Sequence, residues 1–277
     1  MEGLSVIIPN YNNAKYITQC VESIVSQSYL PTEIIIVDDC STDNSVEVIE
    51  RLRGLHQIIK PVFLKKNGGV SNARNVGLQN AVTKYVTFID ADDFYYNQEK
   101  LKNEMSIIQS SNAEKVLAYS VTAYVDPQGA LLPIAMNNRI KRKQFIEGKA
   151  LIDIVSMRKQ KRIPRDYIIE KDVLSGVGGY SYPVNFYEDL DLLMRLAEAG
   201  VCFCCTYKFG TGYRQSEAGL SKRSHEEHII ARRSIQLEYY KRLSTFQKVQ
   251  CSILMTCNSL TQKTKKFLKS VIKKMMR

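Results

Sequence analysis

Tyr85-Val86-Thr87-Phe88-Ile89 is an apolar run typical of a buried strand, and it ends in the acidic stretch Asp90-Ala91-Asp92-Asp93. Open α/β sheets bind ligands in the crevice at the carboxyl ends of their strands. Asp90 and Asp92 are one residue apart, so on extended backbone their side chains point the same way. Such a pair can hold a hard divalent cation through oxygen ligands. Asp-rich segments also end strands and cap helices, so this stretch alone leaves both interpretations open.

A second acidic strand end lies upstream. Glu33-Ile34-Ile35-Ile36-Val37 is a short apolar run that ends in Asp38-Asp39, and residues 41–45 behind it are rich in side chains that cap helix starts. The chain opens with a third apolar run, Leu4-Ser5-Val6-Ile7-Ile8, after which apolar residues recur at helical spacing over 16–25. We therefore expect strands at both runs and a helix over 16–25.

A glycine-marked loop, Asn67-Gly68-Gly69, leads into a predicted helix that carries Arg74. Strand, loop and helix thus alternate through residue 93, and each strand end bears polar or acidic groups. This alternation is the layout of a nucleotide-binding α/β unit.

Five segments along the chain combine apolar strands, glycine-containing loops or clustered acidic residues. They are Ser5-Val6-Ile7-Ile8-Pro9-Asn10-Tyr11-Asn12, Glu33-Ile34-Ile35-Ile36-Val37-Asp38-Asp39, Gly68-Gly69-Val70-Ser71-Asn72-Ala73-Arg74-Asn75, Phe88-Ile89-Asp90-Ala91-Asp92-Asp93, and Gly178-Gly179-Tyr180 followed by Glu188-Asp189-Leu190-Asp191-Leu192. The first four resemble family 2 glycosyltransferases of the GT-A fold, and the fifth resembles that family's acidic catalytic segment. The middle of the chain and its tail contain no matching motif.

The resemblance implies a nucleotide-binding role for the first three segments. Pro9, Tyr11 and Asn12 would lie against the nucleotide. Asp39 would accept a hydrogen bond from the base, most often uracil, and an ionised carboxylate accepts an N–H in a strong charge-assisted bond. Arg74 would lie near the diphosphate of the sugar donor, where a cation stabilises the charge of the leaving group.

The last two segments would supply the metal site and the catalytic base. By the same resemblance, Asp90 would contact the ribose or the sugar, while Asp92 would bind Mn²⁺ or Mg²⁺ with Asp93 close by. Asp189, beside Glu188, would be the general base that takes the proton of the acceptor hydroxyl. Acidic residues are also favoured in the first turn of a helix by its dipole, which is the alternative explanation for Glu188 and Asp189.

The sequence departs from the family pattern in two places. Cys40 follows the second strand's aspartates where the family often has glycine, and we expect it to be tolerated in a turn. The family also often has a metal-binding histidine shortly after a Tyr-Arg pair, but Tyr213-Arg214 is followed here by Gln215-Ser216-Glu217. His225 lies further on and is a weak candidate for that ligand.

The 277 residues are enough for one large α/β domain with a helical appendage. We expect no transmembrane helix, because no apolar run is long enough, and no signal peptide, because the first residues enter a predicted strand at once. Of the seven cysteines, Cys202, Cys204 and Cys205 fall in an apolar strand pattern, and no pair has zinc-type spacing. Reduced thiols and a cytoplasmic location are therefore expected. His225 and His228 have helical spacing but lack further zinc ligands.

Positive charge is concentrated in the tail. The chain has a net charge of +11, and residues 241–277 contain ten basic and no acidic residues. Apolar residues repeat between the lysines of this tail at helical spacing, which suits docking on an anionic membrane surface. A helix packed on the domain, with its lysines in water, is the alternative. A nucleic-acid partner is not expected, because the first 240 residues are nearly neutral.

Two smaller basic clusters, Arg139–Lys143 and Arg158–Arg162, fall where the resemblance places the acceptor site. They are either solvated helix faces or contacts for an acceptor that carries phosphate, such as a lipid diphosphate sugar.

The predicted fold is α/β, a GT-A type mixed, mostly parallel sheet flanked by helices, with a C-terminal helical extension. Residues 1–220 would form the glycosyltransferase domain, with the nucleotide-sugar-binding half over 1–100 and the acceptor half over 101–220. Basic helices would follow over 221–277. We also expect a strand over 116–125 and a helix over 190–199.

The predicted function is metal-dependent inverting transfer of a sugar from a nucleotide diphosphate donor, a UDP-hexose or UDP-N-acetylhexosamine, to a saccharide or lipid-linked saccharide. Surface polysaccharide or lipid-linked oligosaccharide assembly is the expected pathway. The alternative is a catalytically degenerate nucleotide-sugar-binding protein. A nucleotidyltransferase is not favoured, because the glycine- and arginine-rich opening loop of those enzymes is missing.

Overall fold

The computed structural model describes residues 2–132, 146–149, 151–156, 166–181, 187–215 and 225–256. The strands of this part are β1 (Leu4–Asn10), β2 (Glu33–Asp38), β3 (Ile59–Phe63), β4 (Tyr85–Phe88), β5 (Phe94–Tyr95), β6 (Val116–Val125), β7 (Gly148–Lys149), β8 (Tyr167–Glu170) and β9 (Cys202–Arg214). Its helices are α1 (Ile17–Val25), α2 (Ser45–Leu55), α3 (Val70–Asn80), α4 (Lys100–Ser110), α6 (Leu151–Val155), α7 (Lys171–Gly176), α8 (Glu188–Glu198), α9 (His225–Arg242) and α10 (Thr245–Thr256).

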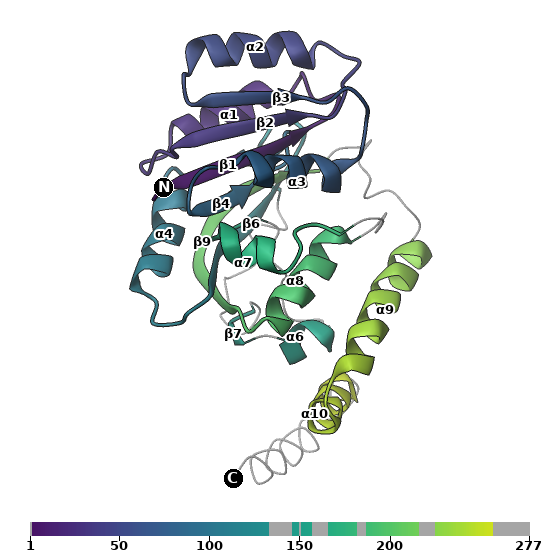
Figure 1. Cartoon of the computed structure of the whole chain (residues 1–277). Helices are drawn as coiled ribbons and strands as arrows, with labels where there is room; N and C mark the ends of the chain where they lie inside the picture. The colour runs from purple at the N-terminus through teal and green to yellow at the C-terminus, as the bar shows by residue number, and fades with distance from the viewer. Residues whose placement is uncertain are drawn as a thin grey trace.

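The described strands form one sheet in the order β3-β2-β1-β4-β8-β6-β9-β5, with β7 paired to β9 (Figure 1). The first four strands run parallel to one another. β8 is antiparallel to its neighbours β4 and β6, whereas β9 is parallel to β6 and antiparallel to β5 and β7. The predicted mixed α/β sheet is confirmed, and its parallel half is the half that bears the acidic strand ends.

Helices cover both faces of the sheet, so the central strand β1 is buried along its whole length. Ile7 packs in one core with residues of α3 and α8. Ile8, on the opposite face, packs in a second core with residues of α1, α2 and α4. Burying an isoleucine side chain stabilises a fold by about 1.5–3 kcal/mol, so these two layers fix the position of β1 firmly.

A glycine sets how closely α3 approaches the sheet. A Cβ atom at Gly77 would lie only 2.3 Å from Cγ2 of Ile7 in β1. At the start of the same helix, Gly69 adopts a φ of 83°, a conformation that glycine takes without strain. The two glycines together let α3 begin sharply and lie tight against β1, which brings Arg74 over the carboxyl edge of the sheet.

Most predicted elements are present with shifted ends. The strand predicted over 116–125 is β6, and the helix predicted over 190–199 is α8, which begins two residues earlier at Glu188. The predicted strand around Cys202 continues to Arg214 as β9. The six cysteines in the described ranges are free thiols, as expected.

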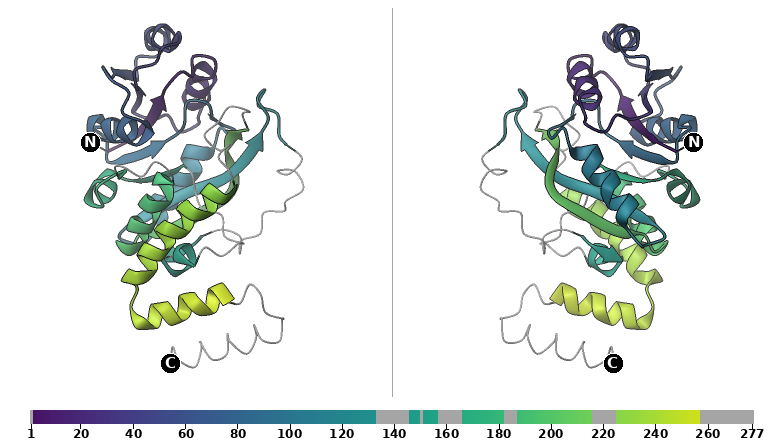
Figure 2. Two further views of the ribbon diagram at one scale, coloured as in Figure 1. Left: turned by 90° about the vertical axis from the view of Figure 1, so that its right-hand side faces the viewer. Right: turned by 90° about the vertical axis from the view of Figure 1, so that its left-hand side faces the viewer.

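Helices α9 and α10 follow the sheet domain, and α10 turns away from the line of α9 (Figure 2). The membrane-docking prediction rests on residues 263–277 of the basic tail, and that segment lies outside the described residues, as do both smaller basic clusters, whereas the start of the tail belongs to the end of α9 and to α10. Within the described part, no helix is both long enough and apolar enough to cross a bilayer.

Candidate active site

Three candidate segments meet at one edge of the sheet. β1 lies between β2 and β4 and is parallel to both, so their carboxyl ends point the same way. Residues 9–12 end β1, residues 38–39 end β2, and residues 90–93 follow β4. The topology therefore brings the predicted nucleotide-binding and metal-binding groups together, as expected for an α/β sheet.

Asp39 is buried and holds the loop that leads into α3. Its two carboxylate oxygens accept backbone hydrogen bonds from Gly68 at 2.8 Å and from Gly69 at 2.7 Å. Its own N–H donates to the carbonyl of Asn10 at 2.8 Å. A carboxylate oxygen has a second lone pair, so the predicted bond from a base N–H is compatible with these contacts. That bond to a base stays a prediction.

The end of β1 presents an aromatic ring next to this loop. Pro9 is buried within the strand, whereas Tyr11 is 46% exposed. Asn12 has a φ of 54° and ties the segment to the turn after β2, because its N–H donates to Oγ of Ser41 and its side-chain oxygen accepts the N–H of Thr42 at 2.7 Å. Tyr11 is thus held at the surface where a planar base can stack on it.

Cys40 occupies a backbone conformation that favours glycine. Its φ of 63° lies in the left-handed region, where Cβ crowds the following carbonyl oxygen. Asp38 fixes the turn through both of its carboxylate oxygens. One accepts the N–H of Ser41 at 3.0 Å, and the other accepts the hydroxyl of Ser41 at 2.6 Å. The turn thus tolerates Cys40, but it does so with backbone strain that a glycine would not experience.

The acidic stretch after β4 gathers three carboxylates. Asp90, Asp92 and Asp93 each place one oxygen within 4.8 Å of the others. Mg²⁺ and Mn²⁺ prefer oxygen ligands, so the donor type and the proximity of these groups fit the predicted cation. Asp90, for which the resemblance implies a sugar contact, belongs to the same group of possible ligands.

Arg214 fixes this acidic stretch from β9. Its backbone N–H donates to Oδ1 of Asp93 at 2.9 Å, and its Nε donates to the carbonyl of Asp92 at 2.8 Å. The Tyr213-Arg214 pair thus lies beside the candidate metal ligands, where the family often has a histidine nearby. Residues 216–224 and the side chain of His225 lie outside the described part of the chain. A third ligand from this region therefore stays a prediction.

Arg74 connects the acidic stretch to the start of α8. Its guanidinium donates to Oδ1 of Asp90 at 2.7 Å and to Oε1 of Glu188 at 2.8 Å, and it lies 5.1 Å from the ring centroid of Tyr180. Burial lowers the pKa of Arg74, but Asp90, Tyr180 and Glu188 outweigh that effect and hold it above its usual value. Arg74 is therefore a permanent buried cation, and the carboxylate of Glu188 is engaged with it.

Asp189 lines the same cavity as Asp90 and Asp93. Residues from strands, from α3 and from loops complete the wall, namely Arg74, Thr122, Asp166, Tyr180, Thr211 and Tyr213. Asp189 is the second residue of α8, which begins directly after Tyr187, a residue with a φ of 61°. Oδ1 of Asp189 accepts the backbone N–H of Leu190 at 2.8 Å, so the start of α8 fixes this carboxylate at the cavity wall.

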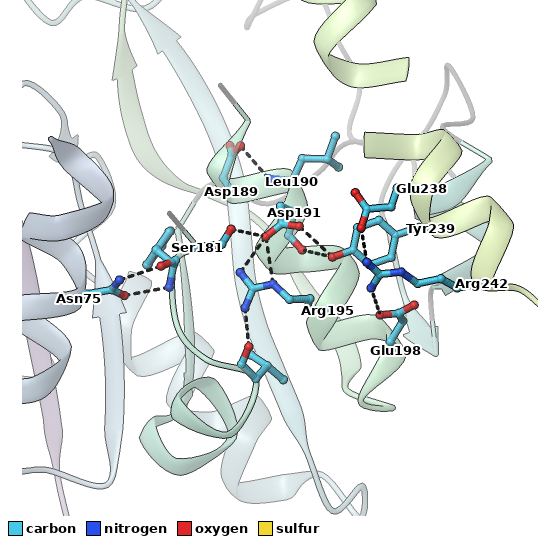
Figure 3. A network of polar contacts seen from close by, with 12 residues as sticks. Asn75, Ser181, Asp189, Leu190, Asp191, Arg195, Glu198, Glu238, Tyr239 and Arg242 are labelled. Atoms are coloured by element: carbon cyan, nitrogen blue, oxygen red, sulfur yellow. Dashed lines mark hydrogen bonds and ion pairs between the residues drawn. The ribbon is translucent and has the colours of Figure 1, made fainter. Parts of the chain in front are cut away.

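A network of polar contacts holds α8 in place (Figure 3). Asp191 accepts hydrogen bonds from Ser181 at 2.6 Å, from Nε of Arg195 at 3.0 Å and from the hydroxyl of Tyr239 at 2.8 Å (Figure 3). These bonds lower the pKa of Asp191, although burial opposes them. Helix α9, which carries Tyr239, is thus bonded to the helix that carries Asp189.

Some residues of the cavity had no signal in the sequence. Thr122, Asp166 and Thr211 lie in three different stretches of chain, and none of them belongs to the five motif segments. In the sequence, Tyr180 is the last residue of the segment Gly178-Gly179-Tyr180 and has no predicted role of its own. It is instead a wall of the cavity, and burial raises the pKa of its hydroxyl well above the usual value.

The fold and the cavity define an α/β protein with carboxylates gathered at the carboxyl edge of its parallel strands. The family model described as glycosyl transferase family 2 matches residues 5–160, which is more than half of the chain. The chain therefore belongs to glycosyl transferase family 2.

Curated relatives match the first part of the chain. A putative teichuronic acid biosynthesis glycosyltransferase, TuaG of Bacillus subtilis (strain 168), is 37% identical over 121 residues, which cover 44% of this chain and 46% of that protein. A poly(ribitol-phosphate) β-N-acetylglucosaminyltransferase, TarS of Staphylococcus aureus (strain Mu50), is 36% identical over 119 residues, or 42% of this chain and 21% of TarS. The matched region thus spans about half of one relative and a fifth of the other.

Solved structures show the same fold. Residues 1–349 of S. aureus TarS in complex with UDP-GlcNAc superpose with a TM-score of 0.68 at 22% identity, covering 92% of this chain and 71% of that one. The mannosyltransferase PcManGT from Pyrobaculum calidifontis, in complex with GDP-Man and Mn²⁺, has a TM-score of 0.62 at 15% identity and covers 100% of this chain and 81% of its own. The GT-A type fold predicted from the sequence is confirmed.

Proposed function

We propose that this chain is a metal-dependent glycosyltransferase that moves a sugar from a nucleotide diphosphate donor to an acceptor hydroxyl with inversion. The observation behind this proposal is the single cavity that contains Asp90 and Asp93 of the metal-binding group together with Asp189. Sugar transfer needs a group that stabilises the leaving diphosphate and a base that accepts the acceptor's proton. The cavity provides candidates for both.

Asp189 is the proposed general base. Its carboxylate takes the proton of the acceptor hydroxyl as that oxygen bonds to the anomeric carbon and the bond to the diphosphate breaks. A single base opposite the leaving group gives direct displacement, which inverts the anomeric centre. Glu188, whose carboxylate is bound by Arg74, acts in this scheme by holding Arg74 beside Asp90.

The donor would lie across the carboxyl edge of the parallel strands. Asp39 and the exposed ring of Tyr11 would bind the base, with Pro9 and Asn12 shaping the end of β1 beneath it. Asp92 and Asp93, with Asp90, would hold Mn²⁺ or Mg²⁺. When bound, such an ion neutralises charge on the diphosphate.

The donor is proposed to be a UDP-hexose or UDP-N-acetylhexosamine. This assignment is supported by the likeness to TarS, whose structures with UDP-GlcNAc and with UDP superpose on this chain. The names of TuaG and TarS support a pathway of cell-surface polysaccharide assembly, with a saccharide or lipid-linked saccharide as acceptor. A cytoplasmic location and membrane docking through the basic tail belong to the same proposal.

A donor screen tests the function. Purified protein is incubated with UDP-glucose, UDP-galactose, UDP-GlcNAc or UDP-GalNAc, with and without Mn²⁺, together with a panel of saccharide acceptors, and released UDP is measured. We expect release from one or two of these donors, only with the cation present. Asp172→Asn, at an exposed position of α7, is the matched control for aspartate-to-asparagine variants of the site and should release UDP as the wild type does.

Calorimetry with UDP separates the two alternatives. Tight Mn²⁺-dependent binding of UDP without turnover on any donor would contradict the catalytic proposal and favour the degenerate nucleotide-sugar-binding protein. If the protein neither bound UDP nor released it from any donor, both the catalytic proposal and the nucleotide-sugar-binding alternative would be contradicted.

A further inference from the structure

A buried charged cluster lies behind the cavity, and the proposed catalytic scheme does not use it. The ammonium of Lys100 is 2.9 Å from Oδ2 of Asp166 and 2.8 Å from Oε2 of Glu104. The side chains of Lys100 and Glu104 are 0% exposed and that of Asp166 is 9% exposed. A buried charge is costly unless it is paired, so Lys100 keeps a carboxylate partner ionised at this depth.

Asp166 connects this cluster to the cavity. Its Oδ2 accepts both the ammonium of Lys100 and the hydroxyl of Thr211, the latter at 2.6 Å. Among the described residues no donor is bonded to its other oxygen, Oδ1. Asp166 lines the cavity that also contains Asp90 and Asp189. Within the described part of the chain, Oδ1 of this nearly buried carboxylate is therefore the oxygen that can accept a bond from a ligand in the candidate active site.

Two neighbours extend this polar wall. Thr122 of β6 lines the same cavity and is half-buried, and its hydroxyl forms no hydrogen bond with any described residue. Tyr213 of β9 adds an aromatic ring, which packs edge-to-face against Tyr124 with centroids 5.8 Å apart. An ionised acceptor, a hydroxyl and an aromatic ring on one wall complement a ring compound that bears several hydroxyl groups.

Asp166 already has a cation beside it. The ammonium of Lys100 lies 2.9 Å from Oδ2 of Asp166 and is shared with Glu104, while Arg74 in the same cavity is paired with two other carboxylates. A metal ion bound at Oδ1 of Asp166 would lie close to the ammonium of Lys100 and would be repelled by it. A hydroxyl group can instead donate to the available oxygen without adding charge.

We propose that Asp166 and Thr122 form a subsite that binds hydroxyl groups of a hexose ring in the active-site cavity. The inference rests on the proposed function, and it assigns sugar recognition to residues outside the five motif segments. The hexose of the donor and that of the acceptor present the same chemistry, so the experiment has one arm for each. Lys100 and Thr211 are positioning residues, because they act by orienting Asp166.

The donor arm compares calorimetric affinities for UDP and for the four UDP-sugars, with Mn²⁺ present. The acceptor arm uses saturation-transfer NMR to measure binding of free glucose, galactose, GlcNAc and GalNAc to protein loaded with UDP and Mn²⁺. If the subsite binds the donor's hexose, the effect appears in the donor arm, and if it binds the acceptor's hexose, it appears in the acceptor arm. In that arm Asp166→Asn should weaken sugar binding about 10- to 100-fold, because a hydrogen bond to a charged group is lost. In the same arm Thr122→Val should weaken it about 2- to 10-fold, while the affinity for UDP alone stays unchanged.

Thr122→Val guards against a folding artefact, since Asp166→Asn leaves Lys100 with one ionisable partner fewer. Asp172→Asn is again the surface control. Unchanged sugar binding by both variants in both arms overturns the subsite. If the wild-type chain does not bind UDP, the proposed function fails, and the NMR arm run without UDP still decides whether a hexose binds through Asp166.

Discussion

Cys40 shows how a single residue can reveal strain beside a binding loop. Its left-handed backbone costs an L-amino acid about 1–2 kcal/mol, and glycine would avoid this cost while losing about 0.5–1 kcal/mol through its freer unfolded chain. Cys40→Gly should therefore raise the free energy of unfolding by about 0.5–1 kcal/mol, measured by urea denaturation. Cys40→Ala keeps Cβ and should give no gain. Equal stability of all three proteins would contradict the strain.

Glu104 makes a pH-dependent contribution to stability. Burial is the main reason that its pKa rises from the usual 4.5 to about 7, although the ammonium of Lys100 opposes the shift. Between pH 4.5 and about pH 7, the carboxyl of Glu104 has lost its proton in the unfolded chain but keeps it in the folded chain. The stability that Glu104 contributes is thus complete at low pH and is lost as the pH rises through about 7.

Glu104→Gln removes this titration. Relative to the variant, the wild type should lose on the order of 3 kcal/mol of unfolding free energy between about pH 4 and pH 8. Urea denaturation of both proteins across this range measures the difference. Glu50→Gln, at an exposed position of α2, should show no such trend. A difference between wild type and Glu104→Gln that does not change with pH would contradict the assignment.

At the scale of elements, the buried hydroxyl of Tyr239 bonds α9 to α8, beside a half-exposed ion pair of Arg242 with Glu198. Tyr239→Phe removes the bond from that hydroxyl to Asp191, and should lower the free energy of unfolding by about 0.5–1.5 kcal/mol. Tyr240→Phe is the matched control, because the Tyr240 hydroxyl contacts Ser252 at an exposed position and should cost less than about 0.5 kcal/mol. Thermal melts of the two variants give the comparison. Equal losses would mean that the bond to Asp191 does not couple the helices.

Elements with a strong local pattern could be predicted from the sequence, and short ones could not. β1, β2, β4 and β6 are apolar runs bounded by polar residues, and that signal lies within each segment. β3 reads Ile59-Lys60-Pro61-Val62-Phe63, where the lysine and the proline hide a strand at the edge of the sheet. β5 and β8 are only two and four residues long, and their pairing partners are distant in sequence.

At the scale of the whole molecule, the same contrast divides the candidate site. Asp90, Asp92 and Asp93 were predictable because three carboxylates follow one strand. The ion pair of Arg74 with Glu188 joins residues 114 positions apart, and the bond from Arg214 to Asp93 spans 121. Only the folded chain brings such residues together, so these contacts cannot be predicted from the spacing of residues within one segment.

The basic tail gives a prediction for the whole chain. Seven basic residues lie between Lys263 and Arg277, and each contributes about 1 kcal/mol near an anionic bilayer. We expect sedimentation with anionic liposomes at low salt, weaker sedimentation as salt is raised, and none with neutral liposomes. Replacing the six lysines of this segment by glutamine in the full chain should abolish it. Equal binding by both proteins would contradict membrane docking through the tail.

The central claim is that Asp189 acts as the base in a cavity shared with the metal-binding carboxylates. The direct measurement is the turnover of Asp189→Asn in the UDP-release assay, alongside its calorimetric affinity for UDP with Mn²⁺. The account predicts a fall in turnover of about 10²- to 10⁴-fold with UDP affinity unchanged, because only proton transfer is lost. Full turnover by Asp189→Asn would contradict it.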